Sequence, residues 1–267
     1  DGQKIVTGKP LFGLDYKKEG MLIAMIVHPP AFGLKLKSFD GAAAKTMPGI
    51  KDVFKINVYN EGETQWCDTI SFNDLVVVVG NTTWEVMNAK KAITCEWEQI
   101  NRKEKDLPFF GKTKTVVTPS GLENSVDHLA KMIAASKSEA TVVRKDGDPE
   151  AAFKKATTIL ERSYTAPFLA HSPLEPMNFF AHVTAEKAEL VGPIQTPEFM
   201  EKSASIRLGL PIEKIDIQMT RMGGGFGRRL YGHFVVEAAV ISQKVNAPIK
   251  LIYTREDDMT TGIYRPA

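Results

Sequence analysis

The first hundred residues alternate between short apolar runs and polar segments, a pattern that predicts buried strands separated by helices. The longest apolar runs, Met21–Val27 and Leu75–Val79, have strand length and are far too short to cross a bilayer. Asp40 and Asn81 stand where helix caps are expected. Residues 1–100 are therefore predicted to form an α/β unit. Its other strands are predicted at Val53–Val58 and Ile93–Trp97. Its helices are predicted at Gly41–Met47 and Thr82–Ala92.

Residues 101–146 are predicted to be a linker that carries one helix. Asn101–Gly121 is polar, with clusters of Lys and Glu and a proline, which is typical of a linker. The helix is predicted at Leu122–Ser136. A turn at Lys145–Pro149 then opens a short helix, Glu150–Ala156.

A second unit is predicted over residues 147–267. One helix is predicted at Glu198–Leu208 and another at Gly232–Val245. The second helix carries apolar residues at helical spacing, which predicts a core stripe of Phe234, Ala238, Ile241 and Val245. The strands are predicted at Thr158–Tyr164, Phe179–Val183, Glu189–Val191, Ile215–Met219 and Ile249–Tyr253.

Composition limits the function classes. The chain has 267 residues, 43% apolar and 25% charged, which suits a globular protein with a sizeable core. A net charge of +2 does not suggest a general nucleic-acid or membrane-surface binder. Cys67 and Cys95 have no metal-type spacing, and they leave open a disulfide or two free thiols. The chain begins at Asp1 without Met and ends without a closing element, so we expect a piece of a longer polypeptide.

The most distinctive stretch is Arg221–Arg229, with four glycines in five positions between a predicted strand and a predicted helix. Glycines leave the backbone N–H groups accessible to a ligand, and the start of the following helix and the two arginines add positive charge. The stretch therefore suits an anion with several oxygens, such as a phosphate or pyrophosphate. The spacing matches neither the dinucleotide fingerprint nor the phosphate-loop and kinase patterns. The alternative interpretation is a tight turn whose glycines only relieve crowding.

Three other segments contain side chains that could bind a ligand or take part in catalysis, but each also has a simpler structural interpretation. Gln195 lies in a proline-rich loop between a strand and a helix, where a solvent-facing amide is the simpler interpretation. His171 and Glu175 share an extended loop and could act as acid and base, but we favour Glu175 as a structural acceptor of backbone amides. The charge run Arg255–Asp258 is typical of a solvated turn, and His233 begins the last helix.

Taken together, several of these segments resemble the xanthine dehydrogenase/aldehyde oxidase family of molybdenum hydroxylases. The glycine loop carries the resemblance first, with Arg221, Met222, Gly223, Gly224, Gly225, Phe226 and Gly227. The following arginines, Leu169–Asn178 and Arg255–Ala267 narrow it to the large, molybdopterin-binding subunit of the isoquinoline oxidoreductase/periplasmic aldehyde dehydrogenase branch. Gly8–Ile50 is similar too, so the resemblance covers nearly the whole chain.

The resemblance implies an α+β fold, in which residues 1–100 form an α/β hammerhead domain and residues 147–267 form part of the molybdopterin-binding region. Gln195 matches the family glutamine that hydrogen-bonds a metal oxygen ligand, although Ile194 and Val191 replace the usual Thr and Trp. Arg228 and Arg229 are expected to hold a phosphate-bearing part of the cofactor or the loop's own carbonyls. The residues implied to lie against the cofactor are Gly223, Gly224, Gly225, Phe226 and Gly227.

The family reaction is water-dependent oxidative hydroxylation of an aldehyde or N-heterocycle. For this branch the expected cofactor is molybdopterin cytosine dinucleotide. The resemblance implies an iron–sulfur small subunit, an electron-accepting cytochrome or similar carrier, and a periplasmic location. The family's general-base glutamate has no counterpart within the 267 residues. The resemblance also implies no metal ligand among the residues of this chain. We therefore expect this piece alone to be inactive and to bind no cofactor tightly. The alternatives are a stand-alone phosphate- or nucleotide-binding module that uses Gly223–Arg229, and a non-catalytic interaction domain.

Overall fold

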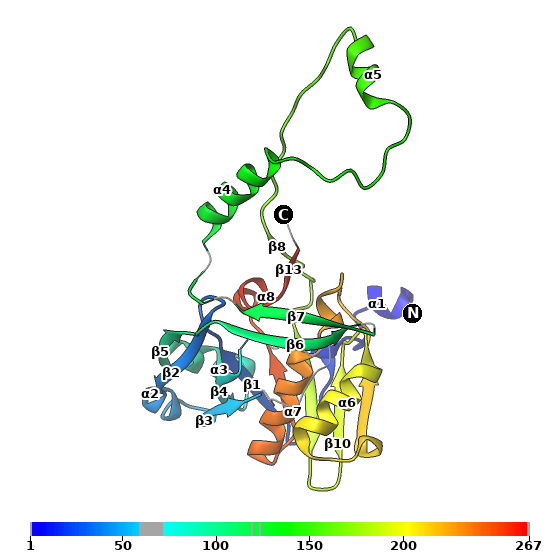
Figure 1. The fold of residues 1–267 in the computed structure, drawn as a ribbon. Helices are drawn as coiled ribbons and strands as arrows, with labels where there is room; N and C mark the ends of the chain where they lie inside the picture. Colours follow the sequence, from blue (N-terminus) through cyan, green and yellow to red (C-terminus); the bar gives the residue numbers. More distant parts are fainter. Residues whose placement is uncertain (1, 59–71, 110, 119, 123, 266–267) are drawn as a thin grey trace. The chain divides into compact units, whose positions relative to one another are not determined.

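The computed structural model describes residues 2–58, 72–109, 111–118, 120–122 and 124–265, and Cys67 lies outside these ranges. The chain forms two compact units (Figure 1). The larger unit contains the described residues up to Leu122 together with Ala170–Arg265. The smaller unit contains the residues between them, from 124 to 169.

A seven-stranded sheet, counted over the described residues, organises the larger unit. Its strands are β1 (Leu22–Val27), β3 (Ile50–Asn57), β4 (Asp74–Gly80), β9 (Asn178–Val183), β10 (Ala188–Gly192), β11 (Ile215–Met219) and β12 (Ile249–Ile252). They lie in the order β11-β10-β9-β12-β1-β4-β3. β1 pairs in parallel with β12 and antiparallel with β4. Strands from the predicted first and last units therefore share one sheet, through pairings between residues far apart in the chain.

The larger unit also contains helices, 3-10 turns and short strands. Its helices are α1 (Gly2–Val6), α2 (Ala42–Lys45), α3 (Thr83–Lys91), α6 (Pro197–Leu208), α7 (His233–Val245) and α8 (Arg255–Thr260). Its 3-10 turns are η1 (Gly13–Asp15), η2 (Ile212–Lys214) and η3 (Arg228–Leu230). The short strands are β8 (Leu169–Ala170), which begins at the last residue of the smaller unit, and β13 (Tyr264–Arg265). Helices and mixed strand pairings confirm the predicted α+β class.

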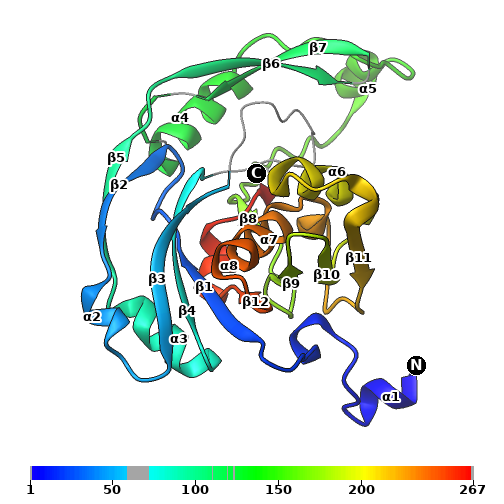
Figure 2. The ribbon, with the colours of Figure 1, turned by 90° about the horizontal axis from the view of Figure 1, so that it is seen from below.

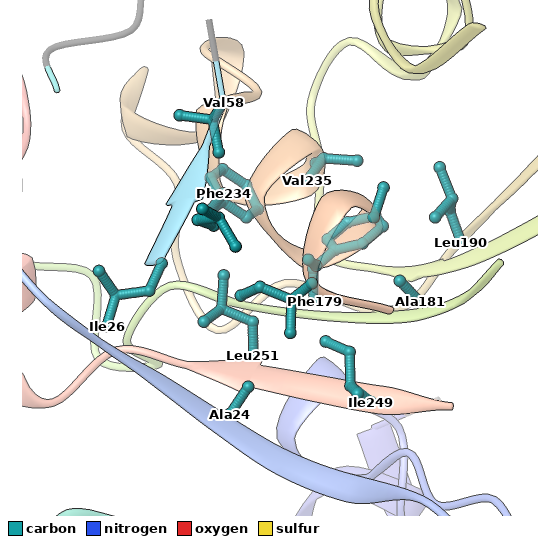
Figure 3. Close-up of a cluster of buried hydrophobic side chains, with 14 of the residues drawn as sticks. Ala24, Ile26, Val58, Phe179, Ala181, Leu190, Phe234, Val235, Ile249 and Leu251 are labelled. Carbon is teal, nitrogen blue, oxygen red and sulfur yellow. The ribbon is translucent and has the colours of Figure 1, made fainter. Parts of the chain in front are cut away.

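Helices cover both faces of the sheet, which explains why β1 and β4 are apolar at successive positions. Ala24 and Ile26 pack in a core cluster with residues of α6 and α7, whereas Ile23 and Met25 pack with residues of α2 and α3. Figure 2 shows α3 on one side of β1 and α7 on the other. Figure 3 shows the first cluster, where apolar side chains from β1, β9, β12 and α7 meet.

Two strand pairs depart from the sequence expectation. β2 (Leu34–Asp40), which was not predicted, pairs antiparallel with β5 (Thr94–Gln99). Its register shifts between Leu36 and Ser38, and this irregularity breaks the period-two pattern that identifies a strand. The predicted linker Asn101–Gly121 contains a polar antiparallel hairpin instead, in which Thr115 Oγ1 donates to Asp106 Oδ1 at 2.6 Å. The hairpin strands are β6 (Lys103–Phe109) and β7 (Lys112–Thr118).

The helix caps differ by one residue from the predicted positions in the larger unit. Thr82, not Asn81, caps α3, because its side chain accepts from the backbone amide of Glu85 at 3.3 Å. Gly41 occupies the cap position of α2, and the Asp40 carboxylate accepts from Ala42 N at 2.9 Å. Cap signals therefore identified both helices but not their first residues.

The smaller unit contains the two helices predicted there, α4 (Ser125–Ser136) and α5 (Pro149–Lys155). Asn124 caps α4 by accepting from Asp127 N at 2.8 Å, and Asp148 caps α5 by accepting from Ala151 N at 3.0 Å. The strand predicted at Thr158–Tyr164 is wrong, because these residues form no strand and are exposed. A β-branched sequence needs a partner strand, and none pairs with it among the described residues.

Candidate functional site

The glycine loop, residues Gly223–Gly227, connects the end of β11 to η3 and α7, as the sequence predicted. Its backbone enters the left-handed region at Gly224 (φ 103°) and Gly227 (φ 95°). Phe226 also has a positive φ of 55°, which is uncommon for a bulky residue. The residue is 63% exposed in spite of being aromatic. A positive φ at a bulky residue persists only where the surrounding structure holds it, and such residues cluster at ligand sites.

Neighbouring residues closely approach two of the glycines. A Cβ at Gly223 would lie 2.5 Å from Glu175 Cβ, and one at Gly225 would lie 2.7 Å from Gln195 Oε1. Both distances are too short for real atoms. Relief of crowding therefore explains Gly223, whereas a side chain at Gly225 would displace the Gln195 amide. This interpretation does not conflict with ligand binding.

The amides of the loop differ in how they are satisfied. Gly223 N donates to Glu175 Oε2 at 2.7 Å, and Gly227 N donates to Gln195 Oε1 at 3.3 Å. Between them, the amides of Gly224 and Gly225 donate to no acceptor among the described residues. The ends of the loop are thus held by side chains, while two consecutive central amides stay open to a ligand.

Gln195 is exposed and lies between β10 and α6, directly against the glycine loop. Its backbone amide donates to Arg229 O at 3.0 Å, and its side-chain oxygen accepts from Gly227 N. Its Nε2 donates to no described residue. The simpler interpretation, a solvent-facing amide, is therefore incomplete: one end of the amide holds the loop and the other is available.

The paired arginines are buried, so neither guanidinium group faces an open anion site in this structure. Arg229 donates from Nε to Gly224 O at 2.9 Å and from Nη2 to Glu175 O at 2.8 Å. Of the two roles expected for the pair, Arg229 thus has the second, which is to hold the loop's carbonyls. Burial lowers the pKa of Arg229 to about 10, against the attraction of Glu175 and Asp258, so it stays protonated near neutral pH.

Glu175 has the structural role that we favoured from the sequence. It is buried, and Oε1 accepts from Leu14 N at 3.0 Å while Oε2 accepts from Gly223 N. His171 lies near the exit of the loop, because a Cβ at Gly227 would lie 3.6 Å from His171 Nε2. The structure therefore brings these two residues to the glycine loop, and Glu175 holds its entry.

A charge run such as residues 255–258 is typical of a solvated turn, but in the structure these residues form a helix. The residues form α8, which opens with a capping box between Thr254 and Asp257, and the side chains of Asp257 and Asp258 are buried. This capping box was not recognised in the sequence, because consecutive acidic residues are typical of a charged surface. Asp258 lies 3.6 Å from Arg228 Nε, and Arg255 donates to the Pro173 carbonyl at 2.8 Å.

Asp257 connects α8 to the early part of the chain. Lys90 Nζ lies 2.5 and 2.6 Å from the two carboxylate oxygens, and His28 Nδ1 lies 3.4 Å from Oδ1. Burial by itself raises the pKa of Asp257, but His28 and Lys90 outweigh it and hold that pKa below its usual range. Nothing in the spacing of these three residues had suggested that they meet.

Three more buried polar groups were missed from the sequence. Lys250 Nζ donates to Leu14 O at 2.9 Å and to Tyr16 O, and burial lowers its pKa to about 8. Tyr253 OH donates to Glu237 Oε2 at 2.5 Å, and burial raises the pKa of Glu237 to about 8. Each looked like an ordinary helix or strand residue, because only the fold buries it.

Within the described residues there is no group of three or more His, Cys, Asp or Glu side chains arranged to hold a metal ion. The same residues contain no helix with the length and apolar character needed to cross a membrane. The glycine loop and Gln195 offer hydrogen-bond donors, which are the open backbone amides of Gly224 and Gly225 and the side-chain amide of Gln195.

A family model described as the molybdopterin cofactor-binding domain matches residues 133–267, slightly more than half of the chain. The chain belongs to this family. The match covers the glycine loop, Gln195 and Glu175, so these residues lie inside the domain. This confirms the family resemblance that was inferred from the glycine loop and its neighbouring segments.

Curated relatives match almost the whole chain. The membrane-bound aldehyde dehydrogenase (pyrroloquinoline-quinone) of Gluconacetobacter polyoxogenes is 27% identical over 264 residues, which is 97% of this chain and 30% of the relative. The isoquinoline 1-oxidoreductase subunit beta of Brevundimonas diminuta is 26% identical over 264 residues, covering 98% of this chain and 30% of the relative. This member of the molybdopterin cofactor-binding domain family thus spans about a third of the length of these two proteins.

The fold is also known from solved structures. The reconstituted CO dehydrogenase from Oligotropha carboxidovorans superposes with a TM-score of 0.64 at 21% identity, covering 98% of this chain and 35% of that one. The similarity shows a shared fold. It agrees with the α+β arrangement of the molybdopterin cofactor-binding domain described above.

Proposed function

We propose that the chain is part of the large subunit of a molybdenum hydroxylase and that its glycine loop forms one wall of the molybdopterin site. The observation that carries this proposal is the pair of open amides at Gly224 and Gly225 beside the free end of the Gln195 amide. All three donors lie within the matched cofactor-binding domain. Hydrogen-bond donors fixed in advance suit a cofactor rich in oxygen atoms.

The residues of the site fit such a group in distinct ways. When bound, the molybdenum cofactor supplies the oxidation chemistry of the family. The amides of Gly224 and Gly225 would donate to oxygen atoms of the cofactor, and Gln195 Nε2 would donate to an oxygen ligand of the metal. Phe226 would cover one side of the cofactor, because its ring is exposed beside these donors. Arg229 would act indirectly by holding the loop.

The substrate and the partners are proposed from the relatives. The relatives named above carry aldehyde and isoquinoline in their names, which supports water-dependent oxidative hydroxylation of an aldehyde or N-heterocycle. We extend the proposal to the cytosine dinucleotide form of molybdopterin, an iron–sulfur small subunit, an electron-accepting cytochrome or similar carrier, and a periplasmic location. The base glutamate would come from a part of the subunit outside this chain.

The remaining expectations belong to the same proposal. Residues 1–100 would form the hammerhead domain of the subunit. The 267-residue chain by itself would be inactive and would bind no cofactor tightly, because the proposed site has its other walls elsewhere. Molybdenum and pterin analysis of the purified chain, together with an activity assay, tests this expectation directly.

The decisive experiment is metal and pterin analysis of the parent subunit from its native source. We expect molybdenum and pterin in equal amounts. Gly225→Ala should lower both severalfold, because the added Cβ would press on Gln195 Oε1. Gly2→Ala is the matched control, since nothing lies within 4 Å of that position. A parent protein that contains pyrroloquinoline quinone and no molybdenum would overturn the proposal.

The alternative of a stand-alone nucleotide-binding module lost part of its support when both arginines proved to be buried. Calorimetric titration of the chain with nucleotides separates the two functions. The molybdenum hydroxylase proposal expects no binding that depends on Gly223–Arg229. Tight nucleotide binding that Gly225→Ala abolishes would favour the alternative.

A further inference from the structure

Glu175 is hydrogen-bonded to Gly223 through both its own main chain and its side chain. Glu175 N donates to Gly223 O at 3.0 Å, and Glu175 Oε2 accepts from Gly223 N at 2.7 Å. The other carboxylate oxygen accepts from Leu14 N and from Asn178 Nδ2, each at 3.0 Å. Glu175 is therefore fixed by two further residues while it holds the first residue of the glycine loop.

Arg229 holds the next residue of the loop, Gly224, in a similar way. Its Nε donates to Gly224 O at 2.9 Å, and its Nη2 lies 3.5 Å from Glu175 Oε2. Both side chains are buried, so water competes little for these bonds. The carbonyls of Gly223 and Gly224 are thus both directed toward the Glu175–Arg229 pair.

The direction of two carbonyls fixes the direction of two amides. The described chain contains no cis peptide bond, and in a trans peptide the N–H points opposite to the preceding C=O. Because Gly223 O points to Glu175 N, the Gly224 N–H points away from Glu175. Because Gly224 O points to Arg229, the Gly225 N–H points away from Arg229. These are the two amides that donate to no acceptor among the described residues.

We propose that Glu175 is a positioning residue which, with Arg229, aims the amides of Gly224 and Gly225 at the bound ligand. The identity of that ligand as molybdopterin rests on the proposed function, whereas the orientation of the amides does not. The position requires a carboxylate, because both of its oxygens accept from N–H donors. A glutamine of the same shape would press an NH2 group against one set of those donors.

The test is Glu175→Gln in the 267-residue chain, labelled with ¹⁵N-glycine. Residual dipolar couplings report the direction of the Gly224 and Gly225 N–H bonds, and hydrogen exchange reports the bond of Gly223 N. We expect both couplings to shrink toward zero as the loop loses its fixed orientation. The Gly223 amide should exchange about tenfold faster or more, as expected when a hydrogen bond to a charged group is lost.

Two controls separate positioning from general loss of stability. Glu186→Gln makes the same chemical change on an exposed turn and should alter neither reading. Val77→Ala weakens the core in β4 and is compared at an equal decrease in Tm. If the couplings in Glu175→Gln match those of Val77→Ala, the role of Glu175 is only structural and the proposal fails.

A second variant covers the case in which Glu175→Gln does not fold. Arg229→Lys keeps the charge but loses the planar donor fork, so the Gly225 coupling should shrink. An unchanged coupling there would contradict the proposal. In the parent subunit, Glu175→Gln should also lower molybdenum content. A wild-type parent without molybdenum would refute the proposed function alone, because the couplings would still report the aiming of the amides.

Discussion

The two units of this chain use the same local signals but differ completely in packing. In the larger unit, α7 begins after the glycine loop and buries most of its side chains, including Phe234 and Ile241. In the smaller unit, α4 has a well-formed Asn124 cap and an apolar stripe, yet none of the described residues from 124 to 169 is buried. Capping therefore decides where a helix forms, whereas tertiary contacts decide how much it stabilises the fold.

The same contrast holds for charged groups. Arg229 and Glu175 are both buried in the larger unit and are fixed by backbone carbonyls and amides. Arg144 and Asp146 in the smaller unit lie 2.6 Å apart but are mostly exposed. An exposed pair contributes little because water screens it, whereas removing one partner of a buried pair is costly. Electrostatic effects on stability should therefore be concentrated in the larger unit.

The largest expected effect comes from a matched pair of isoleucines. Ile241 in α7 is 0% exposed, and Ile133 in α4 is 47% exposed. Ile241→Ala should lower the free energy of unfolding by about 2–5 kcal/mol, since it leaves a cavity in the core. Ile133→Ala should change it by less than about 0.5 kcal/mol. Urea denaturation followed by circular dichroism measures both. Equal losses would show that α4 is packed in solution, contrary to the comparison.

A second effect, smaller for each pH unit, is expected in the pH dependence of stability. Burial raises the pKa of Glu237 to about 8, so the folded protein keeps this proton when the unfolded chain, with a pKa near 4.3, has lost it. The stabilising contribution of Glu237 is complete below about pH 4.3 and is lost as the pH rises toward 8. Between these values its share of the stability should fall by about 1.4 kcal/mol per pH unit.

Glu237→Gln should remove this component, because glutamine does not titrate. Glu150→Gln, on the exposed face of α5, is the matched control and should leave the pH profile unchanged. Chemical denaturation at several pH values from 5 to about 8 distinguishes them. A profile that Glu237→Gln leaves unaltered would mean that Glu237 is ionised in the folded protein.

The smallest expected effect concerns the two caps. Thr82→Ala should lower the free energy of unfolding by about 1 kcal/mol, because α3 packs against the sheet and loses its cap hydrogen bond. Asn124→Ala should disorder the first turn of α4 without moving the main unfolding transition. Thermal unfolding reports the first change and the amide signals of residues 125–128 report the second. A shift of the main transition in Asn124→Ala would show that the two units unfold together.

Much of this protein could be predicted from the sequence, because it depends on neighbouring residues. The strand Ile215–Met219, the glycine loop and the helix after it follow from local apolar runs, bare backbone and cap residues, and the structure contains all three. The α+β class and the family also followed from the sequence. Glu175 as an acceptor of backbone amides followed from an acidic residue on a proline-fixed loop.

The tertiary structure alone decided which distant residues meet. In the structure, β1 pairs with β12 in one sheet. Asp257 and Asp258, which belong to a charge run typical of a surface, are buried. The two arginines expected to be available to an anion are buried as well. The tertiary structure also left the amides of Gly224 and Gly225 open, since their direction depends on carbonyls held by Glu175 and Arg229. Burial and carbonyl direction result from contacts between segments far apart in the chain, and no local pattern of residues records them.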